Sequence, residues 1–154
     1  MTIQLSSRDC AKAIIQASRP VLNITGFNDS EWYRKPRDSR KGPWLQGRYE
    51  IIDEKLWREK KPCLYFLTKD SGELKYVGIS VNKIKDRWRT SPAFDKYENP
   101  LNRKEMFHNR CWPHMCEAKR AGSNDTYIVS VLHDTDLVEV LSTIKNEISE
   151  LSVL

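Results

Sequence analysis

Tyr65, Tyr76 and Arg87 are the residues whose types and spacing best suit chemistry, since they follow one another at intervals of eleven residues. A guanidinium group is a planar fork of donors that matches the oxygens of a phosphate. A tyrosine hydroxyl has a pKa near ~10, so it takes a proton from water only where a nearby cation favours the phenolate. Two phenols beside an arginine therefore suit phosphate binding together with proton transfer.

The two tyrosines lie on apolar segments that are joined by a polar turn. Residues 63–68 and 76–80 flank residues 69–73, which contain one glycine, and this pattern predicts a β-hairpin. Side chains two positions apart share a face of a strand, so Tyr65 and Tyr76 can meet across the hairpin. The alternative is that both are half-buried packing residues, which is the commoner fate of a tyrosine.

This arrangement resembles the GIY-YIG nuclease family, in which two strands carrying Gly-Ile-Tyr and Tyr-Ile-Gly precede a helix with an essential arginine. Residues 63–65 (Cys-Leu-Tyr) stand in place of the first triplet, and residues 76–78 (Tyr-Val-Gly) stand in place of the second. Arg87 falls at the arginine position, with one extra loop residue before it. The resemblance extends over residues 62–150. It implies a metal-dependent DNA endonuclease that hydrolyses phosphodiester bonds, with both tyrosines and the arginine in its catalytic site.

The resemblance also implies a glutamate that binds the metal, on the helix after the third strand. Glu139 is the preferred residue, and Glu147, two turns further along, is the alternative. Mg²⁺ or Mn²⁺ suits such a carboxylate because hard divalent ions prefer oxygen ligands, and the ion would stabilise the leaving oxygen. One tyrosine acts as the base in the family. Tyr76 is favoured here, with Tyr65 positioning the water.

Three positions depart from the family pattern. Cys63 replaces the first glycine, Ile79 stands where a lysine sometimes occurs, and Ser91 occupies a place often held by His or Tyr. His108 and Tyr97 are the candidates to substitute for that missing side chain. A second interpretation is therefore a catalytically weak or inactive nucleic-acid-binding module of the same fold.

The elements around the hairpin predict an α+β, GIY-YIG-like domain over residues 62–154, with a small three-stranded antiparallel sheet flanked by helices. After the hairpin we expect helices at residues 83–90, 103–121 and 137–151, and a strand at residues 126–132. The second helix is expected to break at Trp112-Pro113, because the residue before a proline avoids helical geometry.

Residues 1–61 predict a basic N-terminal extension made of helix and loop. The expected elements are a helix at residues 7–17, a short strand or extended piece at 21–24, a loop broken by two prolines at 32–44, and a helix at 53–60.

Positive charge is concentrated in two parts of the chain. Residues 1–62 carry 13 Lys or Arg against 8 Asp or Glu, and residues 75–110 carry nine against four. Such regions are typical of proteins that bind a phosphate backbone, and aromatic side chains among the bases can stack nucleobases. The alternatives are a solvated lysine-rich face and a loop anchored by its tryptophans. The candidate contacts with DNA are Arg34, Lys35, Arg37, Lys83, Lys85 and Arg89.

A group of metal-ligating residue types precedes the last expected strand. His108, Cys111, His114 and Cys116 are each able to bind Zn²⁺. Their spacing matches no common zinc finger, and one continuous helix could not direct all four inward. Buried cysteines and surface histidines are the favoured interpretation.

Composition predicts a globular protein of the cytoplasm. The chain has 154 residues, of which 39% are hydrophobic. No apolar run approaches the ~20 residues needed to cross a bilayer. Four unevenly spaced cysteines do not resemble a secreted disulfide framework. The expected partner is DNA and not a membrane, and double-strand cleavage by a single site would require a homodimer or two visits.

Overall fold

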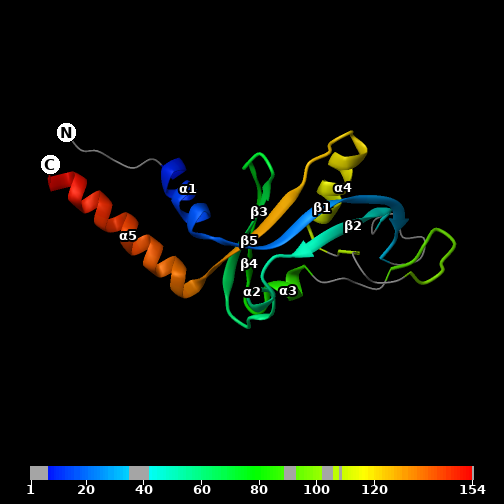
Figure 1. Ribbon diagram of the computed structural model, residues 1–154, viewed down its shortest axis with the longest axis horizontal. Helices are drawn as coiled ribbons and strands as arrows, with labels where there is room; N and C mark the ends of the chain where they lie inside the picture. The colour runs from blue at the N-terminus through cyan, green and yellow to red at the C-terminus, as the bar shows by residue number, and fades with distance from the viewer. Residues whose placement is uncertain (1–6, 35–41, 89–92, 102–105, 108, 154) are drawn as a thin grey trace.

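A computed structural model describes residues 7–34, 42–88, 93–101, 106–107 and 109–153 of the chain. Its helices and strands, in chain order, are α1 (Ser7–Ala17), β1 (Arg19–Trp32), β2 (Trp44–Ile51), α2 (Glu54–Arg58), β3 (Cys63–Lys69), β4 (Leu74–Ser80), α3 (Ile84–Arg87), α4 (Trp112–Arg120), β5 (Tyr127–His133) and α5 (Asp134–Val153) (Figure 1). The predicted hairpin, the last strand, and the helices near both ends of the chain are confirmed within a few residues.

All five strands form one antiparallel sheet, in the order β2-β1-β5-β3-β4. The fold is α+β, but the predicted small three-stranded sheet is wrong. The predicted helical and loop character of the N-terminal extension is also wrong, because the extension supplies β1 and β2; the short strand or extended piece expected at residues 21–24 lies within β1. The domain boundary between residues 61 and 62 stays a prediction, and strands from both sides of it share the sheet.

The long strand β1 does not show a simple alternation because its pairing is interrupted. Its register with β2 shifts between Ile24 and Gly26 and again between Asn28 and Glu31. Each bulge turns the residues that follow it to the other face, so no single apolar alternation runs through the strand. Only the first part of β1 has the pattern expected of a strand.

Trp32 and Trp44 stand opposite each other where β1 ends and β2 begins. Their ring centroids lie 4.9 Å apart in an edge-on arrangement. Trp32 is fully buried, and its indole N–H donates a hydrogen bond to the Leu45 carbonyl oxygen (3.0 Å). The two tryptophans therefore anchor the end of β1 and the start of β2 to the core, which agrees with the alternative interpretation of these two side chains.

Two helices are shorter than predicted. The helix expected from residue 103 begins only at Trp112, while Met106 and Phe107 are buried but not helical. The Asn109 side chain accepts hydrogen bonds from the backbone N–H groups of Cys111 (3.1 Å) and Trp112 (2.9 Å), and such local bonds hold the chain in a turn. The helix expected at residues 83–90 is the single turn of α3.

The main core lies between α4 and one face of the sheet. The Trp112 indole N–H donates to the Leu45 carbonyl oxygen (2.9 Å), and its ring stacks on Phe27 at 5.1 Å and meets Phe107 at 4.9 Å. Each such aromatic pair contributes ~0.5–1.5 kcal/mol beyond the area it buries. These contacts fix the position of α4 over the sheet.

Helix α5 begins at the end of β5 and then runs away from the sheet (Figure 1). It exposes two large apolar side chains, Val138 and Leu141. Within the described ranges, no helix is both long enough and apolar enough to cross a membrane.

Candidate active site

Tyr65 and Tyr76 meet across the β3–β4 hairpin, as the spacing predicts. In the strand register Tyr65 stands opposite Gly78, and Tyr76 stands opposite Leu67, so the two phenols are diagonal neighbours on one face of the sheet. Their ring centroids lie 5.9 Å apart, with the ring planes tilted by 32°. Tyr65 is buried, whereas Tyr76 is partly exposed. The pair therefore has one phenol in the core and one at the surface.

Gly78 is required by the position of the Tyr65 ring. A Cβ atom at position 78 would overlap the outer end of that ring, including its hydroxyl oxygen. Any side chain at this position would push the Tyr65 phenol away from Tyr76. The glycine of the Tyr-Val-Gly triplet thus provides the space in which the tyrosine lies.

The electrostatic surroundings distinguish the two phenols. Burial raises the pKa of Tyr65 well above its ordinary value, and the nearby Tyr76 and Cys111 side chains raise it further, whereas Arg87 lowers it. A hydrogen bond with the Tyr76 side chain also keeps the proton on Tyr65. Tyr65 is thus a hydrogen-bond donor that remains protonated at neutral pH.

Arg87 ends the single turn of α3, which follows β4. Its neighbours Ile84 and Trp88 are buried, and this packing fixes the turn against the core. The Arg87 side chain itself is exposed, yet its charge acts on Tyr65. The structure therefore brings three predicted site residues, Tyr65, Tyr76 and Arg87, into one region.

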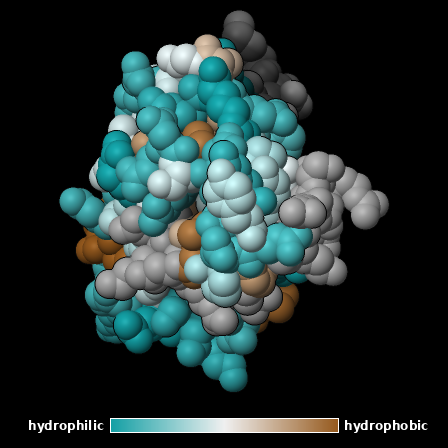
Figure 2. Space-filling view, turned by 90° about the vertical axis from the view of Figure 1, so that its right-hand side faces the viewer, coloured by the Kyte–Doolittle hydropathy of each residue, from teal (hydrophilic) through white to brown (hydrophobic). Residues whose placement is uncertain are grey.

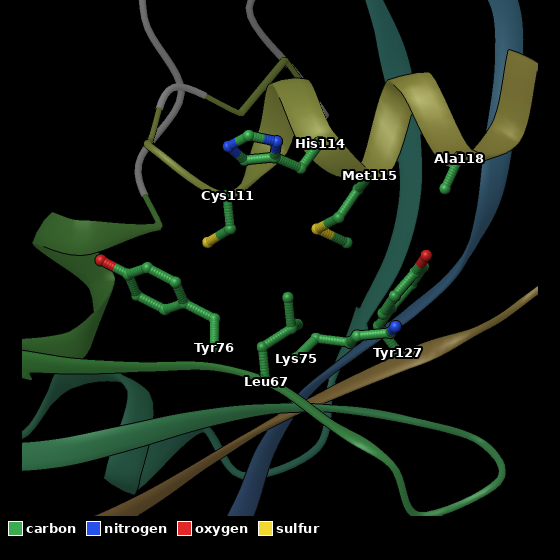
Figure 3. A pocket seen from close by; sticks show the side chains of 8 residues that line it. All are labelled: Leu67, Lys75, Tyr76, Cys111, His114, Met115, Ala118 and Tyr127. Atoms are coloured by element: carbon green, nitrogen blue, oxygen red, sulfur yellow. The ribbon is translucent and has the colours of Figure 1, made fainter.

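A cleft of about 200 Å³ adjoins this region, between the sheet and α4 (Figure 3). We call it the α4 cleft. Leu67, Tyr76 and Tyr127 line it from the sheet side, and Met115 and Ala118 line it from α4. Lys75, Cys111 and His114 complete its lining. The sequence did not predict this cleft, because it depends on how α4 packs on the sheet.

The candidate nucleic-acid contacts are only partly described. Arg34 and Lys83 are half-buried, and Lys85 is exposed on α3. Lys35, Arg37, Arg89 and the auxiliary residue His108 lie outside the described residues. The end of the molecule away from α5 presents a mainly hydrophilic face, with separate hydrophobic spots (Figure 2).

Glu139 lies on α5, the helix that follows β5. It is exposed on α5, and its side chain makes no hydrogen bond or ion pair with the described residues. Among these residues, no group of three or more His, Cys, Asp or Glu is placed to hold a metal ion. Glu147 has no described side chain.

The cysteines and histidines near α4 do not form a zinc site in the part of the chain that is described. Cys111 and Cys116 are buried free thiols, and His114 is exposed. Cys111 donates its S–H to the Asn109 side chain, and Cys116 accepts the backbone N–H of Leu45 (3.3 Å). Burial raises the pKa of the Cys111 thiol to about 12. These features agree with two structural cysteines.

His133 is a buried polar residue that the sequence argument missed. It ends β5 opposite Cys63, with the Arg19 guanidinium 3.3 Å from Nδ1. Glu59 and Asp136 place carboxylate oxygens 3.9 and 4.0 Å from its ring nitrogens. The period of two along a strand was the signal that could have placed His133 on the same face as Tyr65, because His133 follows Val131 by two positions and Val131 pairs with Tyr65.

A scan against protein-family models, a search of curated proteins and a search of solved structures each found no match to this chain.

Proposed function

We propose that this protein is a GIY-YIG-type DNA endonuclease that hydrolyses phosphodiester bonds at Tyr65, Tyr76 and Arg87. The observation that supports it best is the close pairing of Tyr65 with Tyr76 over Gly78. A phenol pair that serves only to pack would not need a hydrogen bond between its side chains, with the Arg87 charge acting on Tyr65.

Arg87 is the phosphate-binding residue in this proposal. Its guanidinium group is exposed, so a phosphate in solution can reach it, and it stabilises the negative charge that develops during hydrolysis. Lys85, on the same turn, adds positive charge that attracts a DNA backbone.

The two tyrosines have different roles in this proposal. Tyr65 donates a hydrogen bond and keeps its proton, so it positions other groups. Tyr76 lies at the surface beside it and, in its phenolate form, accepts a proton from the attacking water and becomes the neutral phenol.

A requirement for Mg²⁺ or Mn²⁺ comes from the family resemblance alone. A divalent ion would supply charge stabilisation at the leaving oxygen. Because the described residues form no group of three ligands, no step is assigned to it.

A nucleic-acid-binding module without activity is the second candidate. The strongly raised pKa of Tyr65 favours it, because one of the two phenols then keeps its proton and cannot act as a base.

Cleavage assays separate the two candidates. The full chain is incubated with supercoiled plasmid, linear duplex and single-stranded DNA in the presence of Mg²⁺ or Mn²⁺. We expect nicking or cutting that falls ~100-fold or more in Arg87→Ala, the size of effect seen when a charge-stabilising donor is removed. Arg58→Ala, an exposed arginine on α2, is the matched control and should retain wild-type activity. Binding of these DNAs without cleavage under any condition would establish the binding module instead.

A further inference from the structure

The α4 cleft is too small for a large ligand and large enough for one ring system. Its volume is about 200 Å³. Pockets for drug-sized molecules measure ~300–1,000 Å³, whereas a cavity of ~150 Å³ holds a benzene ring. The natural occupant by size is therefore a single planar group.

The walls of the cleft are suited to the faces of an aromatic ring. Tyr76 and Tyr127 provide aromatic rings, and Leu67, Met115 and Ala118 provide apolar surface (Figure 3). Stacking on tyrosine is the usual way in which proteins hold an unpaired nucleobase, because every base has an aromatic face.

The remaining lining residues offer hydrogen bonds to the edge of such a ring. Lys75 and His114 carry donor nitrogens at the exposed side of the cleft, where Lys75 also pairs with Glu73 (2.9 Å). Cys111 contributes a neutral thiol, because burial keeps its proton in place. Among the eight residues that line the cleft, none carries a negative charge, so an electron-rich heterocycle meets no repulsion there.

Tyr76 belongs both to the cleft and to the candidate active site. Its ring forms one end of the cleft, while its hydroxyl points away from the cleft toward the turn of α3 (Figure 3). A group in the cleft and a phosphate at Arg87 would therefore lie on opposite sides of one side chain. A base in the cleft and a phosphate at Arg87 would then belong to one nucleotide or to two neighbouring ones.

We propose that the α4 cleft binds one unpaired nucleobase of the DNA strand whose phosphate lies at Tyr76 and Arg87. This inference rests on the proposed function, since it takes the strand as the ligand. The cleft is bounded by the sheet on one side and α4 on the other, so it admits one base and excludes a base pair. Single-stranded DNA, or a nucleotide extruded from a duplex, is then the preferred substrate, because unpairing a base inside a duplex costs free energy.

The test measures binding without cleavage. Fluorescently labelled dT15 and a 15-unit abasic strand of the same charge are titrated with the full chain in EDTA, and anisotropy is recorded. We expect wild-type protein to bind dT15 about tenfold more tightly than the abasic strand, as one stacked base contributes. Equal affinities for the two strands would overturn the base site.

Variants locate the effect in the cleft. Ala118→Leu fills the cleft from α4, and it should reduce the preference for dT15 to within about twofold. His114→Ala should lower it less, since it removes only an edge contact. Ala11→Leu, the same change at an exposed position of α1, is the control and should keep the full preference. Far-UV circular dichroism and a thermal melt check that each variant is folded.

The outcomes for the two proposals can be told apart. A preference for dT15 that survives in Ala118→Leu overturns the cleft as its cause, even if the protein cleaves DNA. Cleavage in Mg²⁺ together with equal binding of dT15 and the abasic strand leaves the nuclease proposal intact and removes the base site. A preference lost in Ala118→Leu, in a protein that never cleaves, supports the base site within a binding module. Failure to bind either strand overturns both.

Discussion

The outer end of the Tyr65 ring occupies the space where a Cβ atom would lie at Gly78, one strand away. This relationship couples the shape of the backbone at β4 to the position of a phenol on β3. It also gives a physical reason for a glycine at that position of the hairpin, independent of any family.

Gly78→Ala should displace the Tyr65 phenol and lower DNA cleavage by about tenfold or more, because small misplacements in a site are costly. Overpacking should also reduce the free energy of unfolding by ~1–3 kcal/mol. Cleavage rate and a urea titration measure the two effects. Gly26→Ala is the control, since its new methyl group meets only the movable end of Arg48. Unchanged cleavage in Gly78→Ala would show that the position of Tyr65 is unimportant.

Tyr76→Phe should reduce single-turnover cleavage by ~10²-fold or more, the usual contribution of a general base. Tyr65→Phe should reduce it less, because the Tyr65 hydroxyl keeps its proton and only positions its neighbours. The two variants are compared at saturating enzyme, so that weaker DNA binding does not obscure the chemical step. The opposite order of effects would assign the base to Tyr65.

Glu139→Gln should leave cleavage within about twofold of wild type, because exposed substitutions outside a site change free energies by ~0.5 kcal/mol or less. The measurement is the rate as a function of Mg²⁺ concentration. A loss of more than tenfold, or a higher Mg²⁺ requirement, would show that Glu139 is the metal ligand implied by the resemblance.

Acidification should destabilise the protein through His133. Burial, together with the positive charges of Lys61 and Arg19, lowers the pKa of His133 below its ordinary value of 6.5, although Glu59 and Asp136 act in the opposite direction. The unfolded chain therefore binds this proton more readily than the folded protein does. The stabilisation due to neutral His133 is present above pH 6.5 and declines as the pH falls below it.

Urea midpoints at pH 7.5 and pH 5.5 measure this effect. His133→Gln should show a smaller loss of stability between the two pH values than wild type does, whatever its stability at pH 7.5. His114→Ala, which removes an exposed histidine, should show the wild-type loss. An equal loss in His133→Gln would mean that other groups cause the acid sensitivity.

Asn109→Ala should lower the free energy of unfolding by about 1 kcal/mol, the typical cost of removing a side-chain cap. Its oxygen accepts two backbone N–H groups at the start of α4, and both would lose their partner. Urea unfolding followed by circular dichroism measures the change, and the exposed variant Asn124→Ala is the control. A larger loss would indicate that α4 depends on this turn for its packing.

The parts of the fold that the sequence predicted are those with unbroken local patterns. The hairpin around Tyr65 and Tyr76 and the last strand are runs of mainly apolar and aromatic residues beside turn residues, and the terminal helices carry apolar residues at helical spacing. β1 was underestimated because two register shifts break its alternation. The start of α4 was misplaced because the Asn109 side chain competes with helical bonding, which propensity alone does not show.

Only the part of the candidate site that is formed by residues close together in the chain could be predicted from the sequence. Tyr65, Gly78 and Arg87 come from one hairpin and the turn after it, so their spacing in the sequence was enough to predict that they lie near one another. The α4 cleft and the surroundings of His133 join segments far apart in the chain. Such contacts follow from tertiary packing, and no short motif records them.

The central place of β5 has a consequence for how the chain folds as it is synthesised. β1 pairs with β2 and β3 pairs with β4 through nearby segments, whereas β5 pairs with both β1 and β3. In a nascent chain that has not yet reached residue 127, the strands can pair only as two separate hairpins, and a hairpin alone is marginally stable. Synthesis of β5 then joins them into one sheet, so the phenol pair becomes part of the complete sheet only after β5 has been made.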